Sequence, residues 1–260
     1  MGAGHGGPLG AAYVAGGSVV HRLEPHLKLV AVLGFALVVV ATPVHAAWAP
    51  AAYAGYAVLV LGAAAVARVP AGRLARGLVV EVPFLVFALL LPVVSRGPRV
   101  EVLGLSLSES GLAAGGGLLA KATLSVLAAT VLAATTEARE LVRGLQRLRL
   151  PALLVQILSF MVRYADVVGG ELRRMRVARE SRGFRGRGPG ALRVVATGAG
   201  ALFVRSYERG ERVHLAMLSR GYGGAMPAGP AAAVPVQAWL VALSLPLTAA
   251  AVLAAGMLLG

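Results

Sequence analysis

The sequence predicts an all-α integral membrane protein with about five transmembrane helices and a cytoplasmic domain of two to three long amphipathic helices. Three observations carry this prediction. Hydrophobic residues make up 58% of the 260 residues and charged residues only 14%, against roughly 25% charged in a soluble domain. Several apolar segments are long enough to cross a hydrocarbon core of about 30 Å. Positive charge gathers in one stretch, residues 137–222, which holds 17 arginines and 7 acidic residues.

Five apolar segments have the length of membrane spans, about 20 residues. They cover residues 28–46, 47–67, 78–95, 110–135 and 236–259. The predicted organisation is a tail and lead-in segment (1–27), four transmembrane helices (28–135), cytoplasmic amphipathic helices (136–225) and a last transmembrane helix (236–259). Val44-His45-Ala46 also resembles a signal-peptide cleavage site, but the other spans anchor the chain in either case.

Positive charge predicts the orientation of the spans, because Lys and Arg gather on the cytoplasmic side of membrane proteins. With the N-terminus inside, the 137–222 stretch lies in the cytoplasm, and of the arginines only Arg96 and Arg99 fall outside. We therefore expect a multi-pass protein embedded in the lipid bilayer, with its N-terminus and amphipathic helices in the cytoplasm.

The membrane segments also predict some of their own packing. Gly111 and Gly115 have the spacing that lets helix backbones approach closely in lipid, and we expect them to pack within the chain. Glu81 and Lys121 are ionisable residues inside apolar spans. Their predicted depths, roughly 5 Å and 20 Å from the cytoplasmic end, argue against an ion pair. The alternation over residues 100–107 permits a small hairpin.

The basic stretch predicts amphipathic helices. Residues 137–150 indicate a short surface helix that ends before Pro151. Apolar residues then recur in steps of four and three, typical of one helix face, at Leu154, Leu158, Met161, Ala165, Val168, Leu172 and Met175. A looser stripe follows at Val195, Ala199, Leu202, Ser206, Val213 and Met217. Arg182 and Arg220 each lie seven residues, close to two turns, beyond a stripe residue, so both extend an apolar face.

The same short motif ends both stripes. Ser181-Arg182-Gly183-Phe184 and Ser219-Arg220-Gly221-Tyr222 lie 38 residues apart, and we call them the first tip and the second tip. One explanation is helix capping, in which glycine takes a left-handed conformation and the aromatic residue packs back. The other is that each arginine inserts into a groove with carboxylates on a partner, where its fork makes bidentate bonds.

Missing residues argue against several chemistries. Cysteine is absent, which excludes disulfides and thiolate metal sites. Residues 115–123 lack the Gly-Lys-Ser/Thr ending of a phosphate-binding loop. The histidines are scattered, without a pair at metal spacing: His5, His21, His26, His45 and His214. We therefore expect no catalytic residue, no bound metal and no direct cofactor.

Two other classes of function fit the sequence less well. A membrane-embedded enzyme needs clustered carboxylates, histidines or a nucleophile, and the sequence shows none. A cationic scaffold that binds lipid or nucleic acid would carry exposed aromatic residues for stacking. The aromatics of the 137–222 stretch lie mostly near helix faces that we expect to pack, so no nucleic-acid partner is predicted.

The chain resembles the transmembrane T component of energy-coupling factor (ECF) transporters, the CbiQ-like family. The hallmark of that family is a pair of Arg-Gly motifs at the ends of cytoplasmic coupling helices, matched here by the two tips. Serine stands at Ser181 and Ser219 where alanine is common. Further resemblance lies in residues 135–151, 158–164, 205–213 and 216–222, and the last of these is most similar to the cobalt-transport branch.

This resemblance implies a non-catalytic subunit of an ATP-driven importer in a prokaryotic cell membrane. Two ATPase subunits would hold ATP and Mg²⁺ and bind the tips, and a membrane-embedded S subunit would capture Co²⁺. Nickel or a vitamin are the alternative substrates. The implied ATPase-coupling residues are Ser181, Arg182, Gly183, Ser219, Arg220 and Gly221, supported by Met175, Phe184, Met217 and Tyr222.

Overall fold

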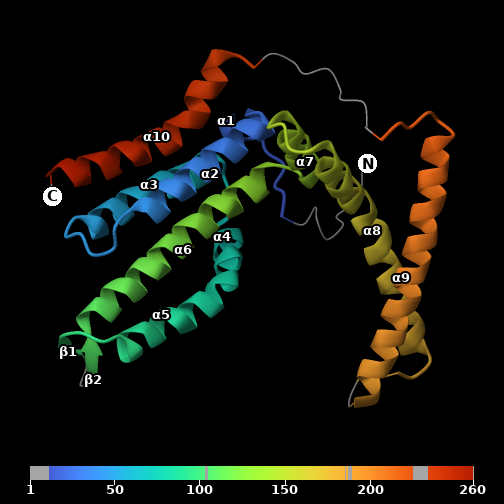
Figure 1. The fold of residues 1–260 in the computed structure, drawn as a ribbon, viewed down its shortest axis with the longest axis horizontal. Helices are drawn as coiled ribbons and strands as arrows, with labels where there is room; N and C mark the ends of the chain where they lie inside the picture. Colours follow the sequence, from blue (N-terminus) through green and yellow to red (C-terminus); the bar gives the residue numbers. More distant parts are fainter. Residues whose placement is uncertain (1–11, 103–104, 185, 187–188, 225–233, 260) are drawn as a thin grey trace. The chain divides into compact units, whose positions relative to one another are not determined.

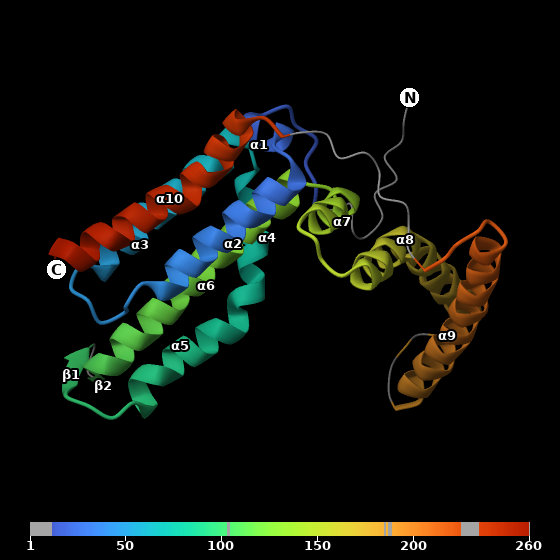
Figure 2. The same ribbon diagram turned by 45° about the horizontal axis from the view of Figure 1, so that its top comes forward.

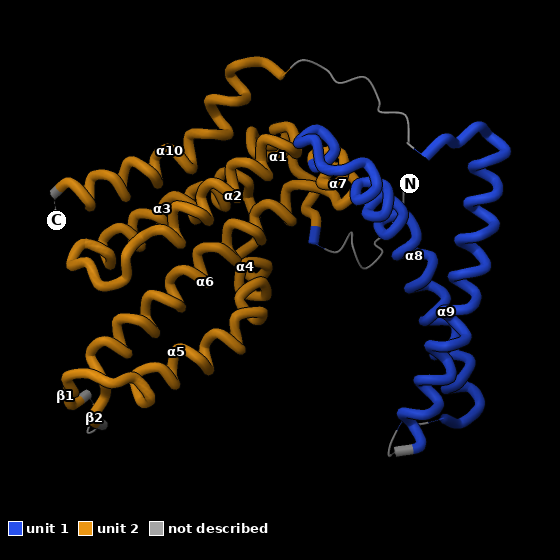
Figure 3. Tube along the Cα trace, in the orientation of Figure 1, with its two compact units in different colours: residues 1–12, 145–231 blue, residues 13–144, 232–260 orange. Residues whose placement is uncertain are grey.

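The computed structural model describes residues 12–102, 105–184, 186, 189–224 and 234–259. Within these residues the chain is helical apart from one small hairpin, so the predicted all-α membrane class is confirmed. The chain divides into two compact units (Figure 3). Residues 13–144 and 232–260 form one, the bundle unit, and residues 1–12 and 145–231 form the other, the arm unit.

Five of the described helices are long and apolar enough to cross a membrane. Four match predicted spans, namely α3 (Ala49–Val66), α4 (Ala71–Leu78) continued by α5 (Val82–Val94), α6 (Glu109–Thr135) and α10 (Val236–Leu259). The fifth is α8 (Ala152–Ser181), whose first half is apolar enough to meet the same criteria. The sequence had assigned it to the coupling domain, since most of its arginines lie in its second half.

Two predicted spans differ in detail from the structure. The span expected over 28–46 is α2 (Pro25–Ala41), which has 17 residues and ends just before Pro43. The span expected over 78–95 is broken by the 3-10 turn η1 (Val79–Glu81) between α4 and α5. Pro83 lies in the first turn of α5, and its ring and missing N–H prevent a continuous helix there.

Helix α6 lies at the centre of the bundle unit and packs against α2, α3, α4 and α5 (Figure 1). The core is built from one face of each central helix: Phe35, Val39, Ala52, Tyr56, Val60, Leu124, Leu127, Ala128 and Ala249. The rings of Phe35 and Tyr56 meet edge to face with centroids 6.1 Å apart. Dispersion contacts and the burial of apolar surface in this core stabilise the packing of α2 against α3.

The glycines of α6 lie against α5, as predicted for packing within the chain. A Cβ on Gly115 would lie 2.5 Å from the carbonyl oxygen of Ala88, and one on Gly111 would lie 2.7 Å from that of Leu91. Backbone therefore touches backbone at this crossing. A Cβ on the neighbouring Gly116 would meet no atom within 4 Å.

Glu81 and Lys121 do not pair, in agreement with their predicted depths. Oε2 of the buried Glu81 accepts a hydrogen bond of 2.8 Å from the Thr123 hydroxyl. Lys121 Nζ donates instead to the carbonyl of Val40, at 2.8 Å. Val40 belongs to the last turn of α2, whose carbonyls have no partner within the helix, so the ammonium group caps that helix end.

The predicted hairpin between the third and fourth spans is present. Strands β1 (Arg99–Val102) and β2 (Leu105–Ser108) pair antiparallel, with Arg99 opposite Ser108. Ser108 also caps α6, because its Oγ accepts the amide hydrogen of Gly111. The hairpin therefore leads directly into α6.

Residues before α2 pack on the end of α6. Val14 N–H donates to the carbonyl of Ala134 at 2.8 Å, and α1 (Val19–Arg22) follows. Lys28 Nζ donates to the Thr135 carbonyl at 2.9 Å and to Thr136 Oγ1 at 3.1 Å. These groups satisfy the last carbonyls of α6, which have no partner within the helix. The segment predicted as tail and lead-in therefore contacts the bundle from Val14 onward.

The short helix predicted over 137–150 is α7 (Ala138–Arg147). Gly144 fits against the start of α2, where a Cβ would lie 3.0 Å from His26 N. Arg149 then takes a left-handed φ of 60° before Pro151, which ends this segment as predicted. In the arm unit, α8 is followed by α9 (Pro189–Leu218), and the two helices run in opposite directions (Figures 1 and 2).

Candidate functional site

The first tip closes α8 with a complete glycine cap. Arg182 is the C-cap residue, and Gly183 takes a φ of 80°. Gly183 N–H donates to the Glu180 carbonyl at 3.0 Å, and Phe184 N–H donates to the Arg179 carbonyl at 3.1 Å. These two bonds define the Schellman motif, which satisfies carbonyls that the helix leaves open.

The second tip repeats this geometry at the end of α9. Gly221 also has a φ of 80°. Its N–H donates to the Leu218 carbonyl at 3.0 Å, and Tyr222 N–H donates to the Met217 carbonyl at 3.0 Å. Arg220 therefore occupies the same place in its cap as the arginine of the first tip.

The serines of the two tips are equivalent too. Ser181 Oγ donates to the Ala178 carbonyl at 3.0 Å, and Ser219 Oγ donates to the Ala216 carbonyl at 3.1 Å. In both tips the hydroxyl therefore bonds back to its own helix, three residues before the serine. The capping explanation of the motif is thus confirmed for both tips, and the two ends are local copies of one another.

Both tip arginines are exposed. Within the described residues, neither the Arg182 nor the Arg220 guanidinium has a hydrogen-bond or ion-pair partner. The nearest acid in sequence, Glu180, is engaged at 2.8 Å by Arg176, and this bond raises the pKa of the Arg176 guanidinium. The tips therefore present unpaired guanidinium groups to the surroundings.

The pairing of α8 with α9 places the tips at opposite ends of a helical hairpin. Near the first tip, a Cβ on Gly198 would lie 3.6 Å from Met175. Near the second tip, the Tyr222 hydroxyl donates to Gln156 Oε1 at 2.6 Å. Because the second tip lies beside Gln156, 26 residues before Arg182, the two tips are separated by about 39 Å along α8.

An acidic residue ties the middle of the hairpin together. Glu171, whose side chain is 14% exposed, accepts from Arg205 Nη1 at 3.1 Å and pairs with Arg209 Nη2 at 3.5 Å. The sequence analysis did not single out this cluster. The signal was Glu171, an acid at the start of the arginine-rich half of α8, together with two arginines four residues apart on one face of α9.

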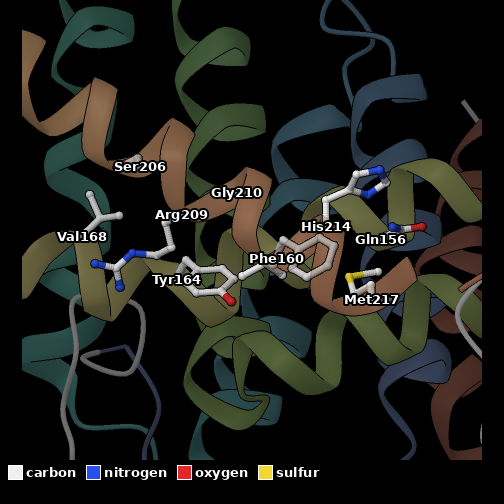
Figure 4. Close-up of a pocket in the computed structure, with 10 residues that line it drawn as sticks. Gln156, Phe160, Tyr164, Val168, Ser206, Arg209, Gly210, His214 and Met217 are labelled. Atoms are coloured by element: carbon white, nitrogen blue, oxygen red, sulfur yellow. The ribbon is translucent and has the colours of Figure 1, made fainter. Parts of the chain in front are cut away.

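A cavity of about 330 Å³ lies between the first half of α8 and the second half of α9. Its walls are mostly apolar with a few polar groups, and it is lined by Gln156, Phe160, Tyr164, Val168, Ser206, Arg209, Gly210, Val213, His214 and Met217. Figure 4 shows the Phe160 and Tyr164 rings side by side in this region, and the rings stack with centroids 6.2 Å apart. Met217, predicted as a supporting residue, belongs to this wall.

The predicted apolar stripe of α8 meets α9 only in part, at Val168 and Met175. Met161 is 61% exposed and Leu154 is 49% exposed, whereas Phe160, Tyr164 and Val168 line the cavity against α9. The stripe of α9 agrees better, since Leu202 is buried and Met217 and Val213 face the cavity. The face of α8 that contacts α9 is therefore rotated from the predicted stripe, because Phe160 and Tyr164, which lie outside the stripe, line the cavity together with Val168.

Comparison with known proteins gives a consistent result. A family model described as cobalt transport protein, CbiQ, matches residues 16–229. The energy-coupling factor transporter transmembrane protein EcfT of Bacillus subtilis is 30% identical over 227 residues, covering 82% of this chain and 83% of the relative. EcfT of Listeria innocua is 29% identical over the same shares. The cobalt transport protein CbiQ of Rhodobacter capsulatus is 30% identical over 196 residues, covering 74% and 77%.

A family match of this length, with tips that share one cap geometry and carry unpaired arginines, agrees with the resemblance found in the sequence. The chain belongs to the CbiQ family of transmembrane T components of energy-coupling factor transporters.

Proposed function

We propose that this chain is the coupling subunit of an ATP-driven importer for cobalt ions. Two ATPase subunits bind the two tips, and the chain transmits their movement to a membrane-embedded S subunit that holds the ion. The observation that carries the proposal is the pair of matching caps, each of which holds an exposed arginine without a partner in the described residues.

The tips suit insertion into acidic grooves. Because the capped helix end is already ordered, an arginine there loses only the rotamer freedom of its own side chain on binding. Its guanidinium can then form bidentate bonds with carboxylates. Two local copies at opposite ends of one hairpin fit two ATPase subunits that each offer the same groove. A separation of about 39 Å, from the 26 residues of α8 between Gln156 and Arg182, leaves room for one subunit below each tip.

The arm unit also offers a surface for the S subunit. The apolar stripe of α8 is exposed at Leu154, Met161 and Leu172, and the cavity between α8 and α9 can receive an apolar side chain. The basic composition of this unit supports a cytoplasmic position next to the membrane. Cobalt as the cargo rests on the description of the family model and on the CbiQ relative.

Charge reversal at the tips tests this proposal. Arg182→Glu and Arg220→Glu should each weaken ATPase co-purification, and the double variant should abolish it, because like charges then face the acidic grooves. Arg212→Glu, an exposed arginine of α9, is the matched control and should keep the ATPases. All variants should insert into the membrane as the wild type does.

Normal recovery of ATPase subunits with the double variant would remove the coupling assignment. Metal uptake by vesicles that contain the full complex should fall in parallel with ATPase recovery. The same vesicles, given Co²⁺ or Ni²⁺, establish which ion is carried.

A further inference from the structure

The two tips are copies in their caps but not in the residue that follows. In the second tip, the Tyr222 hydroxyl donates to Oε1 of Gln156 at 2.6 Å, across 66 positions of sequence. In the first tip the matching residue is Phe184, which has no hydroxyl. We propose that the Tyr222–Gln156 hydrogen bond is a positioning contact that fixes the second tip on α8, so that the two tips respond unequally to the ATPases.

The geometry favours a specific contact over a chance one. Gln156 and Tyr222 are both half-buried, so water competes less for the bond than it would at an open surface. The backbone of Tyr222 is already fixed by its N–H bond to Met217. Its ring therefore projects from a rigid cap, and Arg220, two residues earlier, belongs to the same rigid element.

The consequence concerns where each tip delivers its force, and this step rests on the proposed coupling function. Gln156 lies near the start of α8, shortly after Pro151 and the turn from α7. A push on the second tip reaches this point through one hydrogen bond. Along α8, a push on the first tip travels 26 residues or about 39 Å before it reaches this point. The second tip is thus held directly on the start of α8, whereas the first tip acts on that point from the far end of the helix.

A distance measurement tests the tether directly. The chain has no cysteine, so spin labels can be attached at two introduced cysteines, Arg163→Cys on the exposed side of α8 and Gly223→Cys beside the second tip. In the wild type in lipid nanodiscs, the distance distribution should be narrow. Tyr222→Phe removes one hydroxyl, and loss of a typical hydrogen bond should raise the population outside the main peak roughly fivefold.

Matched variants separate the hydrogen bond from general loosening. Gln156→Leu should broaden the distribution as Tyr222→Phe does, and the double variant should be no broader, because both changes remove the same bond. Gln156→Glu keeps an acceptor oxygen and should stay narrow. Tyr207→Phe removes the hydroxyl of an exposed tyrosine of α9 and should also stay narrow. Equal distributions in the wild type and Tyr222→Phe would overturn the tether.

Transport by the reconstituted complex tests the positioning role. Metal uptake per ATP hydrolysed should fall in Tyr222→Phe and in Gln156→Leu, in proportion to the tethered fraction that the distance distributions of the same variants give. It should recover in Gln156→Glu. A broadened distance distribution with unchanged uptake per ATP would refute the positioning role. Failure of the wild-type chain to recover any ATPase would contradict the proposed function itself, and the distance measurement would still decide the tether.

Discussion

Replacing the glycine of a tip tests whether the cap geometry controls ATPase binding. Gly183 and Gly221 both have a φ of 80°, and a Cβ on either would meet no other atom within 4 Å. Alanine there carries only the backbone penalty of the left-handed conformation, about 1–2 kcal/mol. Valine carries more, because a β-branched residue is a clear outlier in that region. No steric clash adds to either figure.

The chain can relieve this strain locally, because each tip is the exposed end of a helix. A penalty of 1–2 kcal/mol lowers the ratio of closed to open caps by roughly 5–30-fold. If the closed cap is the form that binds, ATPase affinity falls by up to the same factor. The tips lie at opposite ends of the hairpin, so the effects of Gly183→Ala and Gly221→Ala on binding free energy should add.

The assay is titration of purified ATPase subunits onto the chain in lipid nanodiscs. Gly183→Ala should weaken binding, and Gly183→Val should weaken it further. Gly183→Asn should retain most of the affinity, since asparagine tolerates the left-handed region. Gly200→Ala, at a helical glycine of α9 with open space around it, is the control. Wild-type affinity in Gly183→Ala, or an asparagine variant no better than valine, would refute the reasoning.

Three further predictions concern the stability of the two units. In denaturant unfolding, Gly115→Ala should be less stable than Gly116→Ala by roughly 1–3 kcal/mol, because Gly115 touches α5 and Gly116 does not; equal stabilities would contradict the close packing. Lys28→Met, which removes hydrogen bonds to the end of α6, should lower the thermal stability of the purified protein more than Lys121→Met, which removes one. Glu171→Gln should weaken the α8–α9 pairing by roughly 1 kcal/mol, measured as faster hydrogen exchange in both helices, and unchanged exchange would count against the ion-pair cluster.

Local patterns in the sequence predicted much of the fold. Hydropathy located four of the described membrane helices, since a span needs only composition and length. It missed the break before α5, where Pro83 interrupts hydrogen bonding without changing hydropathy. Length and hydropathy also fit α8 as a span, although the arginines of its second half led the sequence to assign it to the cytoplasmic helices.

The candidate site divides in the same way. The cap at each tip is a local structure, so the Arg-Gly-aromatic motif was enough to predict the glycine conformation. The contacts of Glu171 with the arginines of α9, and of Tyr222 with Gln156, join residues that lie far apart in sequence. They depend on the register of the hairpin, which no periodicity in either helix determines.

The close fit of α5 on α6 has a consequence for which substitutions the membrane part can accept over time. Outer positions of α5 such as Val86 and Leu89 are more than half exposed. In the hydrocarbon of a membrane, any apolar side chain is tolerated at such positions. At Gly111 and Gly115 even one methyl group has no space. Among functional variants of this segment, the outer positions should drift freely among Leu, Ile, Val and Phe while the two glycines stay unchanged.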